Sequence, residues 1–433
     1  MRAFATLLHR YAGLLIAAFL FFSGVTGAVI SWDHELDDLL NPELMEARTS
    51  GPALPPLELA KQIEARHPQV HVTYLPLAPE EPGKSLAFGV SPRVDPQTRR
   101  LYEPRFNQVF IDPVSGQELG KREWGAVWPI TKETFVSFLY VLHYSLHMPE
   151  MAGIDRWGLW LLGVIAMIWT IDCFTGFYLT LPARRRTRGF SPDVNEQAGV
   201  ARSWWQRWKP AWLVRWRAGS TKLNFDLHRA FSLWAWGLLF LVAFTAFSLN
   251  LYSEVFYPMM SKISQVTPSP FDVRAPTDKH QPIEPLLSYQ QILARSETAA
   301  QERGWTKPVG SVFYVPQWGI YGVEFHGAGD GHGPGGVGHP KLYFDGRDGQ
   351  LLGDFRPWRG TAADLFVQAQ FPLHSGRILG LPGRILISAL GLIVAMLSVT
   401  GVVIWLKKRS ARVLAARRAS RYAPAVEAEA SGG

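Results

Sequence analysis

Four long apolar stretches dominate the pattern of hydrophobic and polar positions along the chain. They cover residues 11–32, 157–181, 230–253 and 385–406, and each has few or no charged residues. A helix of roughly 20 residues crosses a hydrocarbon core about 30 Å thick. Helices buried in soluble proteins rarely run this far without a charge. The pattern therefore predicts a membrane α-helical protein with four transmembrane helices.

The chain is also predicted to be an internal duplication, because its landmarks recur in the same order. Leu-His-Arg opens the first and third apolar stretches, and Thr-Gly lies near the ends of the second and fourth. Between the stretches, 109–120 and 342–353 each read as a strand, a tight turn of the form Asp-x-x-x-Gly and a second strand. Helix-like spacing precedes them at 56–66 and 287–303. A fixed-order repeat of this many elements predicts one unit, namely helix, outer α+β lobe and helix, occurring twice.

This repeat gives a predicted division of the chain into membrane helices, two outer α+β lobes and cytoplasmic segments. In chain order, the segments are transmembrane helix 1 (8–32), lobe 1 (33–135), an outer entry helix with transmembrane helix 2 (136–181), a basic cytoplasmic loop (182–226), transmembrane helix 3 (227–253), lobe 2 (254–372), transmembrane helix 4 (373–406) and a cytoplasmic tail (407–433).

The charge distribution sets the expected orientation. The formal net charge is +8, and basic residues cluster in the middle loop, at Arg184, Arg185 and Arg186, and in the C-terminal tail. Basic residues that flank membrane helices stay in the cytoplasm, so both termini and the middle loop are expected inside, with both lobes outside. The first apolar stretch is expected to be a retained helix. The positive charge thus indicates orientation and contact with membrane lipid, and no nucleic acid is expected as a partner.

Histidines recur at equivalent positions of the repeat. His9 and His228 lie at the predicted inner ends of helices 1 and 3, while His143 and His374 lie near the outer ends of helices 2 and 4. His147 is one helical turn beyond His143, and the two are expected to share a helix face. Helical bundles build cofactor sites from facing helices, and histidine is an axial ligand of haem iron. The alternative is that each histidine is an interfacial anchor or a helix cap.

Two further features carry candidate chemistry. Asp172 is the only charge deep within a predicted membrane helix, so it is expected either to accept a proton, to hydrogen-bond a cofactor, or to pair with a buried hydroxyl. The glycine-rich segment 326–339 holds His326, His332 and His339, for which a substrate or iron role is weighed against that of a flexible surface loop. A single cysteine permits no internal disulfide and no cysteine-ligated metal centre.

These motifs resemble the PepSY-associated transmembrane family from about residue 8 to residue 409. The segments 153–160 and 172–182 are further similar to FoxB-type ferrisiderophore reductases of the bacterial inner membrane. The resemblance implies a bacterial inner-membrane protein in which both lobes are periplasmic and PepSY-like. It also implies two haem b groups. The inner pair of ligands would be His9 and His228, and the outer pair would be His374 with either His143 or His147.

The expected activity is ferric-siderophore reduction in the periplasm, with release of iron as Fe(II). The short inner loop has no nicotinamide or flavin motif, so the donor is expected to be a quinol or a cytoplasmic reductase. Aromatic residues are candidate substrate contacts: Trp124, Trp128, Trp318, Tyr321 and Trp358. The alternatives are a non-enzymatic binding or sensing protein, a transporter of the intact chelate, and a haem relay to another acceptor.

Overall fold

The computed structural model describes residues 1–183 and 203–430, with side chains described as far as residue 418. The predicted cytoplasmic cluster Arg184, Arg185 and Arg186 lies outside the described residues. The chain forms two compact units. The first, here called the helical unit, comprises Met1–Ala28, His143–Tyr252 and Leu386–Gly433, and the second, the sheet unit, comprises Val29–Leu142 and Ser253–Ile385.

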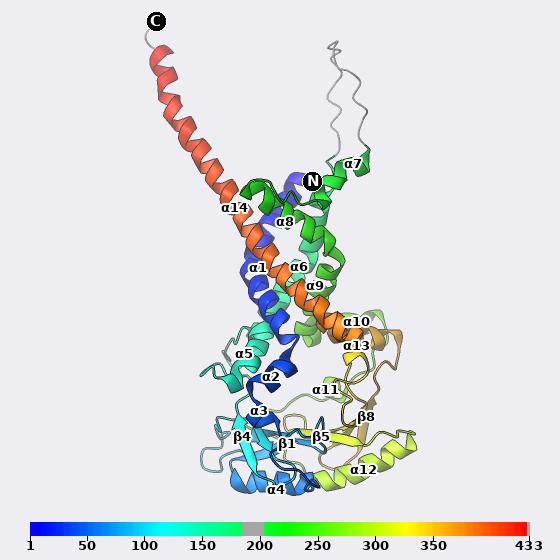
Figure 1. Cartoon of the computed structure of the whole chain (residues 1–433). Helices are drawn as coiled ribbons and strands as arrows, with labels where there is room; N and C mark the ends of the chain where they lie inside the picture. The colour runs from blue at the N-terminus through cyan, green and yellow to red at the C-terminus, as the bar shows by residue number, and fades with distance from the viewer. Residues whose placement is uncertain (184–202, 431–433) are drawn as a thin grey trace. The chain divides into compact units, whose positions relative to one another are not determined.

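The helical unit is built on long apolar helices. Helices α1 (Arg2–Ile30) and α6 (Trp157–Thr180) are long and apolar enough to cross a membrane, as is the segment Arg377–Arg418. The last of these lies mostly in α14 (Gly380–Ala430), which continues far beyond the predicted end at residue 406. Figure 1 shows α1, α6, α9 and α14 running side by side in this unit. The chain is thus a membrane protein, and three segments of its described part are long and apolar enough to be spans.

The predicted span 230–253 is wrong as a single straight helix. It is divided between α8 (Ser220–Trp234) and α9 (Trp236–Asn250), whose axes differ by 72°. The pair gives a fourth span only if the two helices are counted together. Before α8 lie two short elements, α7 (Trp204–Trp208) and the 3₁₀ helix η1 (Lys209–Trp212).

Small residues allow close packing inside the helical unit. A Cβ atom added to Gly24 of α1 would lie 2.6 Å from the carbonyl oxygen of Gly391 in α14. A Cβ atom added to Gly163 of α6 would lie 2.4 Å from the side chain of Leu251. Membrane helices associate through such backbone approaches, because lipid tails are as apolar as the side chains and give no hydrophobic drive.

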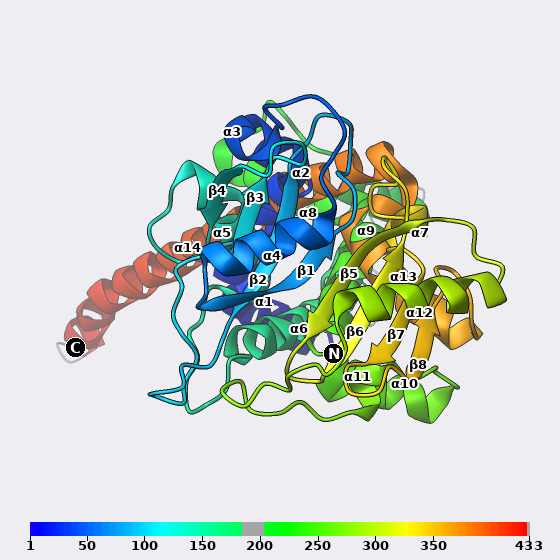
Figure 2. The ribbon, with the colours of Figure 1, turned by 90° about the horizontal axis from the view of Figure 1, so that it is seen from below.

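The sheet unit contains one eight-stranded antiparallel sheet in the order β4-β3-β2-β1-β5-β6-β7-β8. Its strands are β1 (Val70–Pro76), β2 (Leu86–Pro92), β3 (Gln108–Ile111), β4 (Glu118–Arg122), β5 (Val309–Val315), β6 (Ile320–Phe325), β7 (Lys341–Asp345) and β8 (Leu351–Phe355). Helices α4 (Pro56–Arg66) and α12 (Tyr289–Glu302) cover one face, one helix for each half (Figure 2). The helices predicted at 56–66 and 287–303 and the hairpins predicted at 109–120 and 342–353 are confirmed.

The sequence predicted two separate lobes, but the structure contradicts this prediction, because both halves belong to one sheet. Strand β1 pairs with β5, with Tyr74 opposite Phe313, so both halves share one sheet and one hydrophobic core. Four-stranded halves standing alone would each expose the unpaired backbone groups of an edge strand. Pairing β1 with β5 satisfies both edges, which explains why the duplicated halves join there.

The remaining elements of the chain lie largely in the sheet unit. They are α2 (Asp33–Leu40), α3 (Pro42–Met45), α5 (Lys132–Ser145), the π-helical turn η2 (Tyr252–Phe256), α10 (Tyr257–Ile263), α11 (Pro270–Val273), the short helices η3 (Pro334–Gly336) and η4 (Arg377–Leu379), and α13 (Ala362–Ser375).

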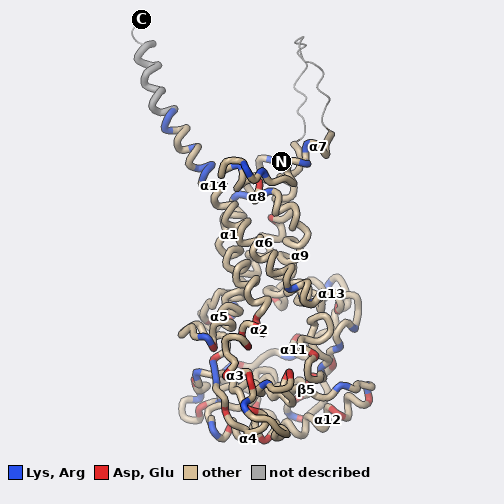
Figure 3. The backbone as a smooth tube through the Cα atoms, viewed as in Figure 1, with Lys and Arg blue, Asp and Glu red and all other residues tan. Residues whose placement is uncertain are grey.

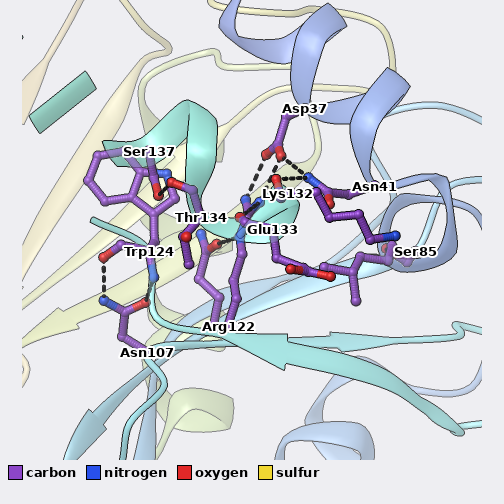
Figure 4. A network of polar contacts seen from close by, with 12 residues as sticks. Asp37, Asn41, Ser85, Asn107, Arg122, Trp124, Lys132, Glu133, Thr134 and Ser137 are labelled. Carbon is purple, nitrogen blue, oxygen red and sulfur yellow. Dashed lines mark hydrogen bonds and ion pairs between the residues drawn. The ribbon is translucent and has the colours of Figure 1, made fainter. Parts of the chain in front are cut away.

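An ion pair centred on a buried arginine ties two of these elements, α2 and α5, to strand β4 (Figure 4). The Arg122 guanidinium at the end of β4 donates two hydrogen bonds to the Asp37 carboxylate of α2, at 2.8 and 2.7 Å. It donates a third to the backbone carbonyl of Glu133 in α5, at 3.1 Å. The Arg122 side chain is 5% exposed. Such paired geometry makes Arg122 a fixed junction of the sheet unit.

Candidate functional site

Two histidines face each other inside the helical unit. His9 lies on α1 and His228 on α8, and their ring centroids are 6.3 Å apart with the ring planes at 56°. A metal ion held by two imidazoles lies about 2 Å from each bonded nitrogen, which places the ring centres roughly 6 Å apart. The observed separation therefore fits two axial ligands on opposite sides of one metal.

The His9 ring is oriented by a carboxylate. Its Nδ1 atom lies 2.9 Å from both carboxylate oxygens of Asp172, on α6. The hydroxyl of Thr175 donates a hydrogen bond to Asp172 Oδ1 at 2.5 Å. A carboxylate only accepts, so His9 Nδ1 carries the proton of this hydrogen bond, and Nε2 is the ring nitrogen that remains available to a metal. Asp172, which is 8% exposed, thus has both a histidine and a hydroxyl as partners.

His228 is oriented in the same way by neutral partners. Its Nδ1 atom lies 3.1 Å from the carbonyl oxygen of Leu397 and 3.0 Å from the hydroxyl of Thr400, both on α14. Because a carbonyl oxygen accepts, Nδ1 is the protonated nitrogen here too, and Nε2 is the one left to bind a metal. The two facing rings therefore share a tautomer but differ in the charge of the group behind them.

A glycine on a neighbouring helix makes room for each ring. A Cβ atom added to Gly176 would lie 3.3 Å from His9 Cε1, and one added to Gly401 would lie 3.2 Å from His228 Cε1. Each glycine follows a threonine that contacts the same histidine or its carboxylate. Each Thr-Gly pair of the repeat thus supplies a hydrogen-bonding hydroxyl and, at the glycine, space for a histidine ring. This arrangement is here called a histidine cradle.

The same cradle serves His143, and the sequence reasoning missed it. The Nδ1 atom of His143 lies 3.1 Å from the hydroxyl of Thr26 on α1, and a Cβ atom added to Gly27 would lie 2.9 Å from its Cε1. The signal was present, because Thr26-Gly27 is a third Thr-Gly pair. Thr26 and Thr245 are equivalent in the repeat, because Thr26 follows His9 by the same number of residues as Thr245 follows His228.

His147 does not share a helix face with His143, contrary to expectation. Helix α5 ends at Ser145, and the next two residues have left-handed backbone angles, with φ of 56° at Leu146 and 51° at His147. The helical spacing therefore stops before His147. His374 belongs to the sheet unit, where it lies in the last turn of α13.

The glycine-rich segment holds its histidines in pairs. The rings of His326 and His339 stack at 4.3 Å, and the Nε2 atom of His339 donates to the carbonyl oxygen of Gly331 at 2.9 Å. His332 Nε2 lies 2.8 Å from His34 Nε2. Throughout the described residues, no group of three or more His, Cys, Asp or Glu side chains is placed to hold a metal ion.

The candidate aromatic contacts differ in accessibility. Tyr321 is 2% exposed, and its hydroxyl donates to the carbonyl oxygen of Leu287 inside the core, so burial removes it from the substrate-contact surface. Trp318 is half-buried and packs edge-on against Phe271 at 5.8 Å. Trp128 is 79% exposed. The other two candidates are Trp124, which packs near Tyr140, and Trp358, which donates to the carbonyl oxygen of Pro334.

Comparison with known proteins agrees with the membrane helices and the paired motifs. Residues 6–408 match the family described as the PepSY-associated TM region. No curated protein gives a significant match. Because the match covers nearly the whole chain, it includes both units and every histidine of the repeat. The protein therefore belongs to the family of the PepSY-associated TM region.

Proposed function

We propose that this protein is a haem-containing inner-membrane reductase that delivers electrons to a ferric siderophore in the periplasm. Each Fe(III) accepts one electron and leaves the chelator as Fe(II), because hard oxygen donors bind Fe(II) far less tightly. The electrons come from a quinol or a cytoplasmic reductase on the inner side. The observation that carries the proposal is the facing pair His9 and His228 at 6.3 Å, with the Nδ1 atoms of both rings engaged.

The residues present suit a haem held by two histidines. Haem supplies one-electron exchange between Fe(III) and Fe(II) when it is bound. His9 and His228 would be the two axial ligands, with Asp172 and Thr400 fixing the ring orientations. Two protein ligands leave no open position for oxygen, and this favours electron transfer over oxygen chemistry. Gly176 and Gly401 would keep the rings in place without a steric clash.

For the second predicted haem, we propose His143 as a ligand from the helical unit. His143 is preferred to His147 because it has a Thr-Gly cradle of the kind found at the inner pair. Basic residues of α8 and of the part of α14 that follows its apolar stretch, drawn in blue in Figure 3, favour a cytoplasmic location for that end of the helical unit. On this orientation, the sheet unit is periplasmic and both termini are cytoplasmic.

The test begins with the purified protein in mild detergent. We expect sharp low-spin absorption bands after dithionite reduction and about two haem b per chain in a pyridine haemochrome assay. Reoxidation of the reduced protein by a ferric siderophore should be faster than by the iron-free chelator and should yield Fe(II). Absence of haem in protein expressed with ample haem would refute the reductase and favour a binding or sensing role. Haem without ferric-chelate reoxidation would favour a relay to another acceptor.

A further inference from the structure

A basic pocket lies in the helical unit, at the end of the α14 apolar stretch. It has a volume of about 350 Å³ and is formed by the loop before α8, the first turns of α8 and the part of α14 around residue 407. Four cations line it, together with apolar side chains: Arg215, Lys222, Lys407, Lys408, Phe225 and Ile404. The proposed electron path uses none of these residues.

Within the part of the chain that the structure describes, most of this positive charge has no carboxylate partner. Arg215 pairs with Asp226 at 2.6 Å, and Asp226 also faces Arg229 at 3.1 Å. Among the described residues, no carboxylate lies within ion-pair distance of Lys222, Lys407 or Lys408. Like charges gathered around one pocket repel each other, so an anion there would be stabilised by Coulomb attraction.

The cations are held in place, and the helix end adds to their field. Lys407 Nζ donates to the hydroxyls of Ser220 and Thr221, at 3.2 and 3.1 Å. These two residues begin α8, whose N-terminus carries partial positive charge. Lys408 Nζ lies 6.0 Å from the centre of the Phe225 ring. The pocket therefore offers several donors at an anion-favouring helix terminus.

The apolar side of the pocket indicates what kind of anion fits. Ile404 belongs to the membrane stretch of α14, and the sequence changes within three residues to Lys407 and Lys408. An anionic phospholipid has the same layout, with acyl chains next to a phosphate. Basic pockets beside membrane helices on the cytoplasmic side bind such headgroups.

We propose that this pocket binds the headgroup of an anionic phospholipid, with the phosphate between Lys222 and Lys407 and the acyl chains along Ile404 and Phe225. The site also adjoins the inner histidine pair. Asn224 lines the pocket and donates to the carbonyl oxygen of Thr400 at 3.0 Å, beside the hydroxyl that contacts His228. A bound lipid would stabilise α8 against α14 at this point. The proposal does not depend on the reductase activity.

The experiment is native mass spectrometry of the full chain, delipidated in detergent and titrated with phosphatidylglycerol or phosphatidylcholine. We expect one phosphatidylglycerol to bind in preference to phosphatidylcholine and to raise the melting temperature. The double variant Lys222→Gln, Lys407→Gln should bind phosphatidylglycerol roughly 30-fold more weakly, from about 1 kcal/mol for each cation near an anionic headgroup. The matched control Arg412→Gln, Arg418→Gln removes two exposed charges of α14 outside the pocket and should bind as the unchanged protein does.

Three results would overturn the proposal. Equal affinity of both double variants for phosphatidylglycerol would show a non-specific surface attraction. Displacement of the lipid by millimolar inorganic phosphate would indicate a site for a free anion. Loss of haem from the pocket variant with lipid affinity unchanged would assign the cations to the haem carboxylates. The single variant Lys222→Gln, which leaves the Lys407 contacts to α8 intact, should weaken lipid binding in the same direction and so separates misfolding from lost binding.

Discussion

Replacement of Asp172 by Asn tests whether a buried charge behind His9 sets the properties of the inner site. The variant keeps the shape of the side chain and an oxygen that can accept from His9 Nδ1, now 2.9 Å from the carboxylate. It removes only the negative charge. A hydrogen bond to a charged group contributes about 1.5–3 kcal/mol, against about 0.5–1.5 kcal/mol for a neutral one. The expected loss is therefore about 1 to 1.5 kcal/mol, or roughly tenfold in haem affinity.

The same charge favours Fe(III) over Fe(II), because a carboxylate increases the electron donation of its histidine. If the whole difference acts on the oxidised state, the midpoint potential of the inner haem should rise by about 59 mV in Asp172→Asn. The assay is a spectroelectrochemical titration with a haemochrome count on the same sample. The control is Thr400→Val, in which His228 still has the carbonyl oxygen of Leu397 as its partner and should shift much less. Unchanged haem content and potential in Asp172→Asn would refute this reasoning.

Three further substitutions test the packing and charge of other sites. Gly27→Ala places a Cβ atom 2.9 Å from His143 Cε1, so we expect loss of about one haem per chain in the haemochrome assay. Arg122→Met leaves the partly buried Asp37 carboxylate without its cation, with only Asn41, among the described residues, still donating to it, and should cost about 3 kcal/mol, measured as a lower melting temperature in detergent. Burial alone would raise the pKa of Asp112, but hydrogen bonds hold that pKa well below its usual range. Asp112→Asn should therefore destabilise at neutral pH, and its difference from the unchanged protein should shrink as the pH falls below the ordinary carboxyl pKa.

Each of these substitutions has a matched control. Gly13→Ala adds a methyl group to α1 where no atom lies within 4 Å, and it should keep full haem content. Arg93→Met breaks a partly exposed pair with Glu64 and should change stability by less than about 1 kcal/mol. Asp95 lies in an exposed turn, so Asp95→Asn should give a smaller effect at neutral pH than Asp112→Asn. A control whose haem content or stability changes as much as that of its test variant would contradict the corresponding prediction.

Local patterns in the sequence determined the elements. The apolar stretches gave α1 and α6, because the length and hydrophobicity of a membrane helix are properties of one continuous segment. The two hairpins were predictable because Gly116 and Gly349 adopt left-handed angles at the end of each Asp-x-x-x-Gly turn, with φ of 69° and 74°. The position of His9 and His228 as repeat equivalents was also visible, since it required only a comparison of the chain with itself.

Tertiary contacts decided what the sequence left open. The break at Ala235, the end of α5 at Ser145 and the pairing of Tyr74 with Phe313 have no local signal that distinguishes them from a continuing helix or a free edge. The site depends on such contacts as well. Asp172 follows His9 by more than 160 positions and acquires its role only because α6 packs beside α1. The partner of each histidine depends on contacts between segments that are far apart in the sequence. The sequence therefore identified the histidines, and only the folded chain assigned their partners.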